Sequence, residues 1–186
     1  MSGIIIFGAA GAGKTTLGGE LARLLHFRHL DLDDYIWRWD TELPFSIFRP
    51  NEEIIADLTR EITAHPRFVM SGGIGRGFRN TYHCNAWFGL AVFMTVPHDL
   101  RMERLRAREF ANYGERTLEG GDMYEHTQNF LDEASRYDTN DAKHFGALEQ
   151  HEKWITELAC PVLRVDGAKP IIENAKLIAE QYLKII

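Results

Sequence analysis

Residues 8–16, with the sequence GAAGAGKTT, constrain the fold of this chain more than any other stretch. They follow an apolar run at residues 4–7, and a helical pattern comes directly after them. Three glycines between a strand and a helix let backbone N–H groups turn inward around an anion, a freedom that a packed core does not require. The spacing matches the phosphate-binding loop pattern G-x-x-x-x-G-K-[ST] in full. We therefore expect a polyphosphate to bind where the first strand ends.

The remainder of the chain alternates between strand-like apolar runs and helical patterns. The predicted strands are residues 3–7, 28–32, 68–71, 90–96 and 161–165. The predicted helices are residues 14–25, 51–65, 99–112 and 170–185, with a further pair within residues 122–158. Because such alternation produces right-handed βαβ units, we expect a doubly wound, three-layer α/β/α fold with a five-stranded parallel sheet. The length of 186 residues suits a single domain over residues 1–186.

The glycine-rich loop predicts the nucleotide end of a binding site. Lys14 would reach the β- and γ-phosphates of ATP, and the Thr15 hydroxyl would ligate Mg²⁺. The N-terminus of the following helix would add unpaired N–H groups and a favourable dipole. The predicted cofactor-binding residues of the loop are Gly8, Gly11, Ala12, Gly13, Lys14, Thr15 and Thr16. ATP and Mg²⁺ are therefore the expected cofactors.

Acidic residues follow the second predicted strand rather than the third or fourth. The third continues as SGGIGRG and the fourth as TVP, without the acid that positions water in motor and AAA-type ATPases, and no Asn-Lys-x-Asp guanine-reading motif is present. These absences argue against an ATPase or a GTPase. In HLDLDDYIWRWD, strand alternation places Asp31 and Asp33 on the same side at the carboxyl edge of the sheet. One carboxylate would hold Mg²⁺ through water and the other would orient or deprotonate an acceptor hydroxyl, unless both only cap a solvated turn.

These features together resemble the small P-loop kinases, of which the shikimate kinase and gluconate kinase families are the nearest and adenylate kinase is more distant. The shared features are the loop, the Asp-x-Asp after strand two, the GGIG after strand three and an arginine-bearing lid. The sequence FRPNE at residues 48–52 is similar to the Phe-Arg-x-x-Glu of shikimate kinases, whose arginine grips the substrate carboxylate. The resemblance implies a P-loop kinase domain with an acceptor-binding insert at about residues 34–65 and a lid at about residues 110–122.

The same resemblance implies roles for individual residues. Arg49 would hold an acceptor carboxylate, Asp33 would contact the acceptor, and Asp31 would belong to the metal shell together with Thr15. The predicted substrate-binding residues are Asp33, Arg49, Gly72, Gly73 and Arg76. Near the place where shikimate kinases carry Arg-Asn-Pro-Leu-Tyr after the lid, this chain has ASRYD at residues 134–138. The pattern that carries the second substrate arginine is therefore not reproduced, which argues against shikimate itself as the acceptor.

Arginines cluster in HDLRMERLRAREF, and glycines with charged residues follow in FANYGERTLEGGD. Phosphoryl transfer needs positive charge against the transferring oxygens and exclusion of water, and a mobile arginine-bearing lid would supply both. Similar kinases use an arginine at the positions of Arg104 and Arg116, and Arg108 shares a helical face with Arg104. The alternative is a solvated helix with Arg–Glu pairs. The predicted catalytic residues are Lys14, Asp31, Asp33, Arg104 and Arg116, with Arg108 as a further cofactor-binding residue.

Aromatic side chains crowd the insert at Trp37, Trp39, Phe45 and Phe48. They would stack on a nucleobase or a sugar face, or they would form a small satellite core. Arg76, which follows the GGIG sequence, would grip a phosphate or carboxylate on the acceptor or would remain a solvated arginine.

The expected activity is transfer of the γ-phosphoryl group of Mg-ATP to a small-molecule acceptor. One alternative is a nucleoside or nucleoside monophosphate kinase, and another is an ATP-binding regulatory protein with little turnover. The net charge of −6 argues against nucleic acid as a partner, because such proteins carry a basic face. No run approaches the roughly 20 apolar residues of a membrane span, and no basic leader is present. We expect a cytoplasmic monomer or weak homodimer whose partners are ATP and the acceptor.

Overall fold

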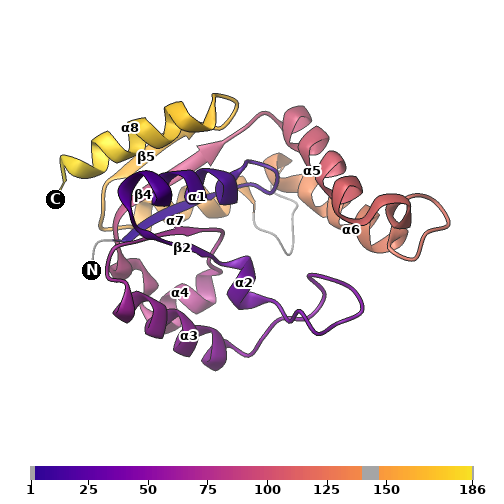
Figure 1. The fold of residues 1–186 in the computed structure, drawn as a ribbon, viewed down its shortest axis with the longest axis horizontal. Helices are drawn as coiled ribbons and strands as arrows, with labels where there is room; N and C mark the ends of the chain where they lie inside the picture. The colour runs from indigo at the N-terminus through magenta and orange to yellow at the C-terminus, as the bar shows by residue number, and fades with distance from the viewer. Residues whose placement is uncertain (1–2, 140–146, 186) are drawn as a thin grey trace.

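Five parallel strands form the centre of the computed structural model, which describes residues 3–139 and 147–185 (Figure 1). The strands are β1 (Gly3–Gly8), β2 (Arg28–Asp31), β3 (Phe68–Ser71), β4 (Phe88–Thr95) and β5 (Val162–Asp166). Their order is β2-β3-β1-β4-β5, and every neighbouring pair is parallel. The predicted five-stranded parallel sheet is confirmed, and the strand that leads into the glycine-rich loop lies at its centre.

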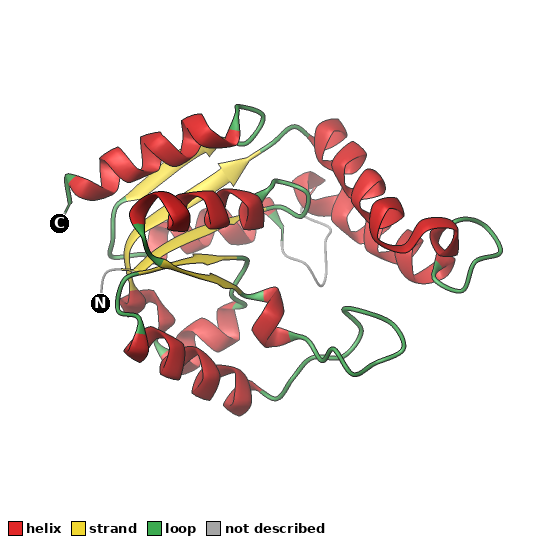
Figure 2. Cartoon of the chain, in the orientation of Figure 1, coloured by secondary structure: helices red, strands yellow, loops and turns green. Residues whose placement is uncertain are grey.

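Helices cover both faces of the sheet, which confirms the three-layer α/β/α arrangement (Figure 2). One face carries α1 (Lys14–Leu25) and α8 (Ile171–Leu183). The other carries α3 (Asn51–Ala64), α4 (Arg76–Tyr82) and α7 (Leu148–Glu157). Beyond the sheet, α5 (His98–Tyr113) and α6 (Tyr124–Ser135) pack against each other. The shorter elements are α2 (Asp33–Ile36) and the 3₁₀ turns η1 (Cys84–Trp87), η2 (Gly114–Thr117) and η3 (Arg136–Thr139).

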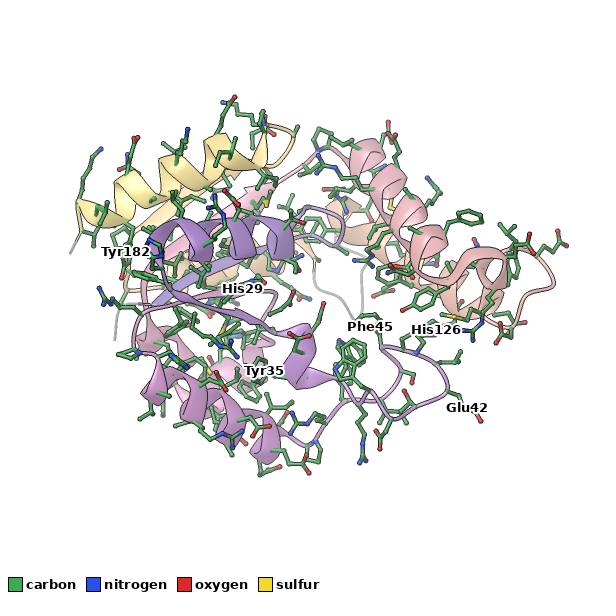
Figure 3. All side chains as sticks on the ribbon, in the orientation of Figure 1. His29, Tyr35, Glu42, Phe45, His126 and Tyr182 are labelled. Atoms are coloured by element: carbon green, nitrogen blue, oxygen red, sulfur yellow. The ribbon has the colours of Figure 1, made fainter. Side chains whose placement is uncertain are left out.

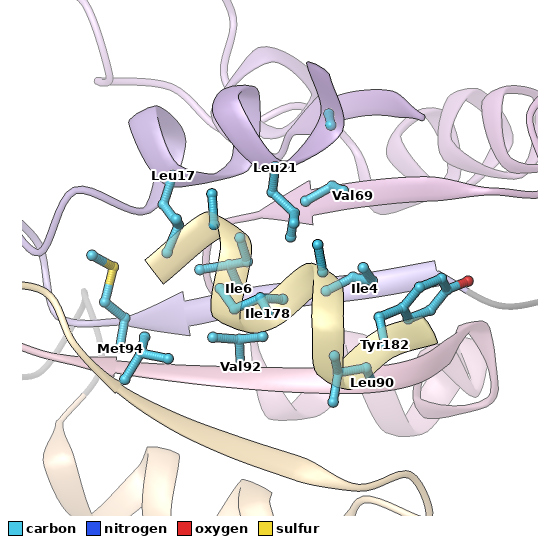
Figure 4. Packing of buried hydrophobic residues seen from close by; sticks show 14 of the residues in the cluster. Ile4, Ile6, Leu17, Leu21, Val69, Leu90, Val92, Met94, Ile178 and Tyr182 are labelled. Atoms are coloured by element: carbon cyan, nitrogen blue, oxygen red, sulfur yellow. The ribbon is translucent and has the colours of Figure 1, made fainter. Parts of the chain in front are cut away.

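The central strand shows why both faces need a cover. Successive side chains of a strand point to opposite faces, and every residue of β1 is buried. Ile4 and Ile6 pack in one apolar cluster with Leu17 of α1 and Ile178 of α8 (Figure 4). The alternate residues of β1 pack in a second cluster with α3 and α7. The continuous apolar run that begins the sequence is therefore the run expected of a strand covered on both sides.

Two glycines inside α1 differ in what surrounds them. A Cβ atom built on Gly18 would lie 2.5 Å from Nε2 of His29 and 3.1 Å from Cβ of Ser71. His29 Nε2 and Ser71 Oγ are themselves hydrogen bonded at 3.0 Å, which joins β2 to β3 beneath the helix. A Cβ on Gly19 would meet its nearest neighbour only at 3.8 Å, an ordinary contact. Close packing of the helix on the sheet therefore explains the first glycine and not the second.

The structure departs from the sequence prediction in three segments. The second strand ends at Asp31, and the chain then turns into α2 at Asp33, so strand alternation was the wrong reason to pair these two residues. The helix α4 was not predicted, because the sequence RGFRNTY has no clear apolar period. The segment predicted as an irregular lid from residue 110 is helical up to Tyr113, and α5 ends where Gly114 takes a φ of 59°.

Candidate functional site

A deep cleft of about 1510 Å³ opens at the carboxyl edge of the sheet. One end is formed by the glycine-rich loop and by the turn after β5, residues 167–171. The other end is formed by the residues that follow β2 and β3 and by α6. This is the edge at which open parallel sheets bind ligands. The volume exceeds that of a typical single-ligand pocket, so the cleft has room for two small molecules side by side.

The loop has the backbone that the sequence predicts for an anion cradle. Gly11 has a φ of 77°, and a Cβ on it would lie 2.7 Å from the carbonyl oxygen of Arg101 on α5. Gly13 caps the start of α1 with a φ of 95°. Thr15 and Thr16 are exposed in the cleft. Of the predicted loop residues, Ala12 alone does not line the cleft: its side chain is buried in the core.

Lys14 lies at the floor of the cleft. Its Nζ donates a hydrogen bond of 2.8 Å to the carbonyl oxygen of Ala9. Removal from bulk water lowers the pKa of Lys14 to about 8, although the charges of Asp33 and Asp31 act in the opposite direction. A cation held in poorly hydrated surroundings is stabilised strongly by an arriving anion, and the arrangement therefore suits a phosphate ligand.

The two predicted carboxylates meet in the cleft by a different route from the one expected. The backbone N–H of Asp33 donates to Oδ1 of Asp31 at 3.2 Å, which is a turn closed by a side chain. Asp33 Oδ1 accepts a further hydrogen bond of 3.2 Å from the indole Nε1 of Trp37. Desolvation between the cleft walls, together with the neighbouring charge of Asp31, raises the pKa of Asp33. A carboxylate of raised pKa is the kind of group that accepts a proton from a hydroxyl.

Arg104 lies where the two halves of the nucleotide end meet. Its Nη1 donates to the carbonyl oxygens of Ala12 at 3.4 Å and of Gly167 at 3.1 Å. The side chain therefore joins α5 to the phosphate loop and to the turn after β5. Arg108 is one turn further along α5 and also lines the cleft, with its guanidinium bonded to Oε1 of Glu109.

Arg116 lies away from the cleft. It belongs to η2, beyond the end of α5, and its guanidinium forms a two-point pair with Asp122 at 2.9 and 2.7 Å. It is not among the residues that line the cleft. The predicted contact between Arg116 and a transferring phosphoryl group would therefore need a movement of the α5–α6 pair.

The half of the cleft formed by the residues after β2 and β3 is called the acceptor half, after its predicted role. Arg49 lines this half, but its charge is already matched. Its Nη2 lies 2.7 Å from Oδ2 of Asp57 and 3.4 Å from Oε2 of Glu53, both on α3. Its Nη1 donates to the carbonyl oxygen of Tyr35 at 3.1 Å. The side chain thus fastens the segment that precedes α3 to this helix. Gly72, Gly73 and Arg76, the other predicted substrate-binding residues, also line this half of the cleft.

Four aromatic side chains lie on one hairpin of the insert, residues 36–49, which we call the aromatic hairpin. Backbone hydrogen bonds of 2.9 Å join Arg38 N to Ile47 O and Arg49 N to Ile36 O at its base. The Trp37 and Phe48 rings stack with centroids 4.1 Å apart. Phe45 meets Trp37 and Trp39 edge-on at 5.9 and 5.0 Å. Only Trp37 is buried, so the hairpin is a wall of the cleft rather than a closed satellite core.

Sequence reasoning missed a buried pair behind the acceptor half. The Tyr137 hydroxyl lies 2.7 Å from Nδ1 of His151 on α7. The other ring nitrogen, Nε2, lies 3.9 Å from the position that a Cβ would take on Gly73, and His151 lines the cleft. Burial, with the charges of Lys14 and Arg79, lowers the pKa of His151 to about 4. The two residues are 14 positions apart in sequence with no helical spacing, and no pattern could have joined them.

Among the described residues, no cluster of three or more histidine, cysteine or acidic side chains is arranged to hold a metal ion. Mg²⁺ at a phosphate site needs no such cluster, because it takes one or two protein oxygens together with phosphate oxygens and water. Asp31 and Thr15 line the same cleft and offer oxygen ligands of that kind. Within residues 3–139 and 147–185, no helix has the length and apolar character of a membrane span.

Comparison with known proteins gives the family. A family model described as an AAA domain matches residues 4–123, about two thirds of the chain. The chain belongs to this AAA-domain family. The match covers the phosphate loop, both carboxylates, the GGIG turn and α5 of this AAA-domain protein. The uncharacterized protein YqaC of Bacillus subtilis strain 168 is 37% identical over 163 residues, which are 88% of this chain and 87% of that protein.

Relatives with a stated activity are small kinases. A shikimate kinase of Bacteroides fragilis is 34% identical over 110 residues, which are 55% of this chain and 61% of that enzyme. The solved structure of a shikimate kinase from Acinetobacter baumannii in complex with shikimate aligns over 99% of this chain and 94% of that one, with a TM-score of 0.56 at 19% identity. A gluconokinase from Sinorhizobium meliloti 1021 gives a TM-score of 0.53 at 14% identity over 98% and 92% of the two chains. At such identities the structures share a fold, and the predicted resemblance to the small P-loop kinase group is confirmed.

Proposed function

We propose that this protein transfers the γ-phosphoryl group of Mg-ATP to a small-molecule acceptor. The observation that carries the proposal is a single cleft in which Lys14, at the phosphate loop, and Asp33, at the acceptor half, influence each other's pKa. Phosphoryl transfer needs a cation on the phosphate and a carboxylate toward the acceptor hydroxyl within one enclosed volume. The named activities of its kinase relatives support the same reaction class.

Each residue then has a defined task. The loop amides and Lys14 would hold the β- and γ-phosphates, and the start of α1 would add its dipole. Thr15 and Asp31 would hold Mg²⁺, which when bound neutralises phosphate charge. Asp33 would orient the acceptor hydroxyl and take its proton, and its raised pKa suits it for this step.

The arginines would serve two purposes in this proposal. Arg104 would keep the loop and the turn after β5 in place around the nucleotide, and Arg108 would face its phosphates from α5. Arg116 would reach the transferring group only after the α5–α6 pair closes. Gly72, Gly73 and Arg76 would contact the acceptor. Arg49 would shape the acceptor wall through α3, because its own charge is already paired.

The first test is ATP consumption with Mg²⁺ across a panel of acceptors: shikimate, gluconate, nucleosides, nucleoside monophosphates and aminoglycoside-type alcohols. We expect one class to stimulate turnover, and the stimulation to vanish in Lys14→Ala. The Asp31→Asn variant should lose transfer while it keeps most of its ATP affinity. Tight ATP binding with the same slow hydrolysis in wild type and Asp31→Asn, whatever the acceptor, would replace the kinase with an ATP-binding regulatory protein.

The aromatic wall favours one second candidate, a nucleoside or nucleoside monophosphate kinase, over an enzyme for small sugar acids.

The proposal also includes a cytoplasmic location and a monomeric or weakly dimeric state without nucleic acid as a partner. Size-exclusion chromatography with light scattering would test the state directly.

A further inference from the structure

The aromatic hairpin presents uncovered rings to the acceptor half of the cleft. Phe48 is 61% exposed and Trp39 is 52% exposed, and both line the cleft. Exposure alone decides nothing, because Phe110 on α5 is 51% exposed and does not line the cleft. What distinguishes the hairpin is that its rings are already stacked and edge-paired into one rigid surface. A pre-ordered aromatic surface loses little entropy when a flat ligand covers it.

The hairpin is also strained at its tip. Phe45 has a φ of 54°, a backbone conformation that residues with a Cβ rarely adopt. Hydrogen bonds of 2.7 Å from Thr41 Oγ1 and 2.6 Å from Ser46 Oγ to the carbonyl oxygen of Leu43 hold the tip in this conformation. Backbone strain of this kind is concentrated at ligand clamps. Phe45 of the hairpin and His126 of α6, both labelled in Figure 3, line the cleft.

Acidic side chains already hold two of the arginines in this half of the cleft. Arg49 is paired with Asp57 and Glu53, and the buried Arg79 lies 3.4 Å from Glu157. Arg76 shares the same Glu157 at 3.8 Å, and its side chain is 62% exposed. A carboxylate or sugar acid would have to compete with the side chains that already bind Arg49 and Arg79. Arg76 is open to a phosphate carried by a ring compound. The floor beside these arginines is apolar, with Ile54, Leu58, Ile74 and Phe78.

The wall is connected to the reacting end of the cleft. Trp37, on which Phe48 stacks, donates its indole N–H to Oδ1 of Asp33. A ring laid on the exposed face of Phe48 is therefore anchored to the element that holds the proposed base. An acceptor bound in this way would carry its hydroxyl or phosphate on a substituent of the ring.

From this geometry, and resting on the proposed kinase function, we propose that the acceptor is a planar heteroaromatic compound whose ring stacks on Phe48 and Trp39. Nucleosides and their monophosphates are the main compounds of this class, and ring-bearing alcohols such as pyridoxine are a second source of the same chemistry. The compound binds in the half of the cleft opposite the turn at residues 167–171, so its ring and the adenine of ATP occupy different ends.

Isothermal titration calorimetry tests the inference on the full-length protein. The nucleotide end is first saturated with Mg²⁺ and a non-hydrolysable ATP analogue, so that added rings cannot bind there. The panel is then adenosine, guanosine, cytidine, uridine, their monophosphates and pyridoxine, with shikimate and gluconate as non-planar compounds. We expect one heteroaromatic compound to bind and neither non-planar acid to do so. Quenching of tryptophan fluorescence provides a second readout.

Three variants separate stacking from general effects. Phe48→Leu and Trp39→Leu should weaken binding of the ring compound about 5- to 150-fold, the range expected for loss of one stacking contact. Phe110→Leu removes an equally exposed ring outside the cleft and should leave the affinity unchanged. Circular dichroism and thermal melting check that each variant folds. If Phe48→Leu does not fold, Trp39→Leu provides the test.

Three outcomes would overturn the inference. The first is equal affinity for the ring compound in all three variants. The second is binding of shikimate or gluconate that does not change in Phe48→Leu, and the third is no binding of any heteroaromatic compound at millimolar concentration. The kinase proposal fails separately. A ring compound that binds through Phe48 but is never phosphorylated in the presence of ATP refutes the kinase and keeps the ring site. A phosphorylated non-planar acceptor whose KM is unchanged in Phe48→Leu keeps the kinase and refutes the ring site.

Discussion

Replacing Lys14 should make the ligand-free protein more stable near neutral pH while it abolishes phosphate binding. The folded structure lowers the pKa of this lysine from 10.5 to about 8, mainly through desolvation. Below pH 8 the folded protein therefore carries a charge that it solvates poorly. Between about pH 8 and 10.5 the unfolded chain binds more protons at Lys14 than the folded one. The contribution of Lys14 to the free energy of unfolding therefore rises with pH in that window. Lys14→Met removes both the charge and this pH dependence.

The size of the effect follows from the same two values. Each tenfold change in a protonation constant corresponds to about 1.4 kcal/mol, so the fall from 10.5 to about 8 has a ceiling of about 3 kcal/mol. Water in the open cleft screens part of it, and we expect a pH-dependent difference of about 1–3 kcal/mol. The hydrogen bond from Lys14 Nζ to Ala9 O contributes a nearly constant term of about 1 kcal/mol to the variant's stability change. The pH dependence therefore isolates the charge.

Urea denaturation at pH 7 and pH 10 measures the difference. The free energy of unfolding of Lys14→Met relative to wild type should be higher at pH 7 than at pH 10, by the stated amount. Lys176→Met, which changes an exposed lysine on α8, should show no such difference. A relative stability of Lys14→Met that is the same at both pH values would refute the reasoning, because the lysine would then not be poorly solvated.

Three further predictions concern packing, proton transfer and the nucleotide end. Gly18→Ala should destabilise the protein by about 1–3 kcal/mol through overpacking, whereas Gly19→Ala should stabilise it by up to ~1 kcal/mol; equal effects in thermal melting would contradict the packing argument. Because the pKa of Asp33 is raised, kcat/KM for the acceptor should fall on the acid side at a pH above the ordinary aspartate value, and a profile flat to pH 4 would exclude this carboxylate as the base. Arg104→Ala should weaken ATP binding about tenfold in calorimetry, and the exposed Arg106→Ala should not; equal affinities would refute a role for the two carbonyl contacts.

Elements with strong local signals were predictable from the sequence. The helix predicted at residues 14–25 has the same bounds as α1, because Gly13 precedes it as the cap and Leu17, Leu21 and Ala22 give it an apolar face. The strand predicted at residues 68–71 likewise coincides with β3. The pairing of Arg49 was also open to prediction. Glu53 and Asp57 lie four positions apart on α3 and so share a face, directly after the segment that carries Arg49.

Other features depend on contacts that no local pattern reports. The chain leaves β2 for α2 at Asp33 because this turn is closed by a hydrogen bond to Asp31, and strand alternation cannot anticipate a side-chain bond. Arg104 has carbonyl partners 92 and 63 positions away, at Ala12 and Gly167. Whether a helical arginine faces phosphate, solvent or the main chain is decided by such tertiary contacts. The untested site assignments remain predictions for the same reason.

The way the aromatic hairpin is attached bears on how specificity could change during evolution. Its two main-chain hydrogen bonds lie within the hairpin, and the side chains of Arg49 and Trp37 fasten it to α3 and to Asp33. The phosphate loop, in contrast, is enclosed by α1, α5 and the turn after β5. A surface segment attached through so few side chains can be exchanged in sequence and length at little cost to the rest of the fold. Acceptor specificity could therefore change during evolution through replacement of the hairpin alone, while the ATP-binding residues stay the same.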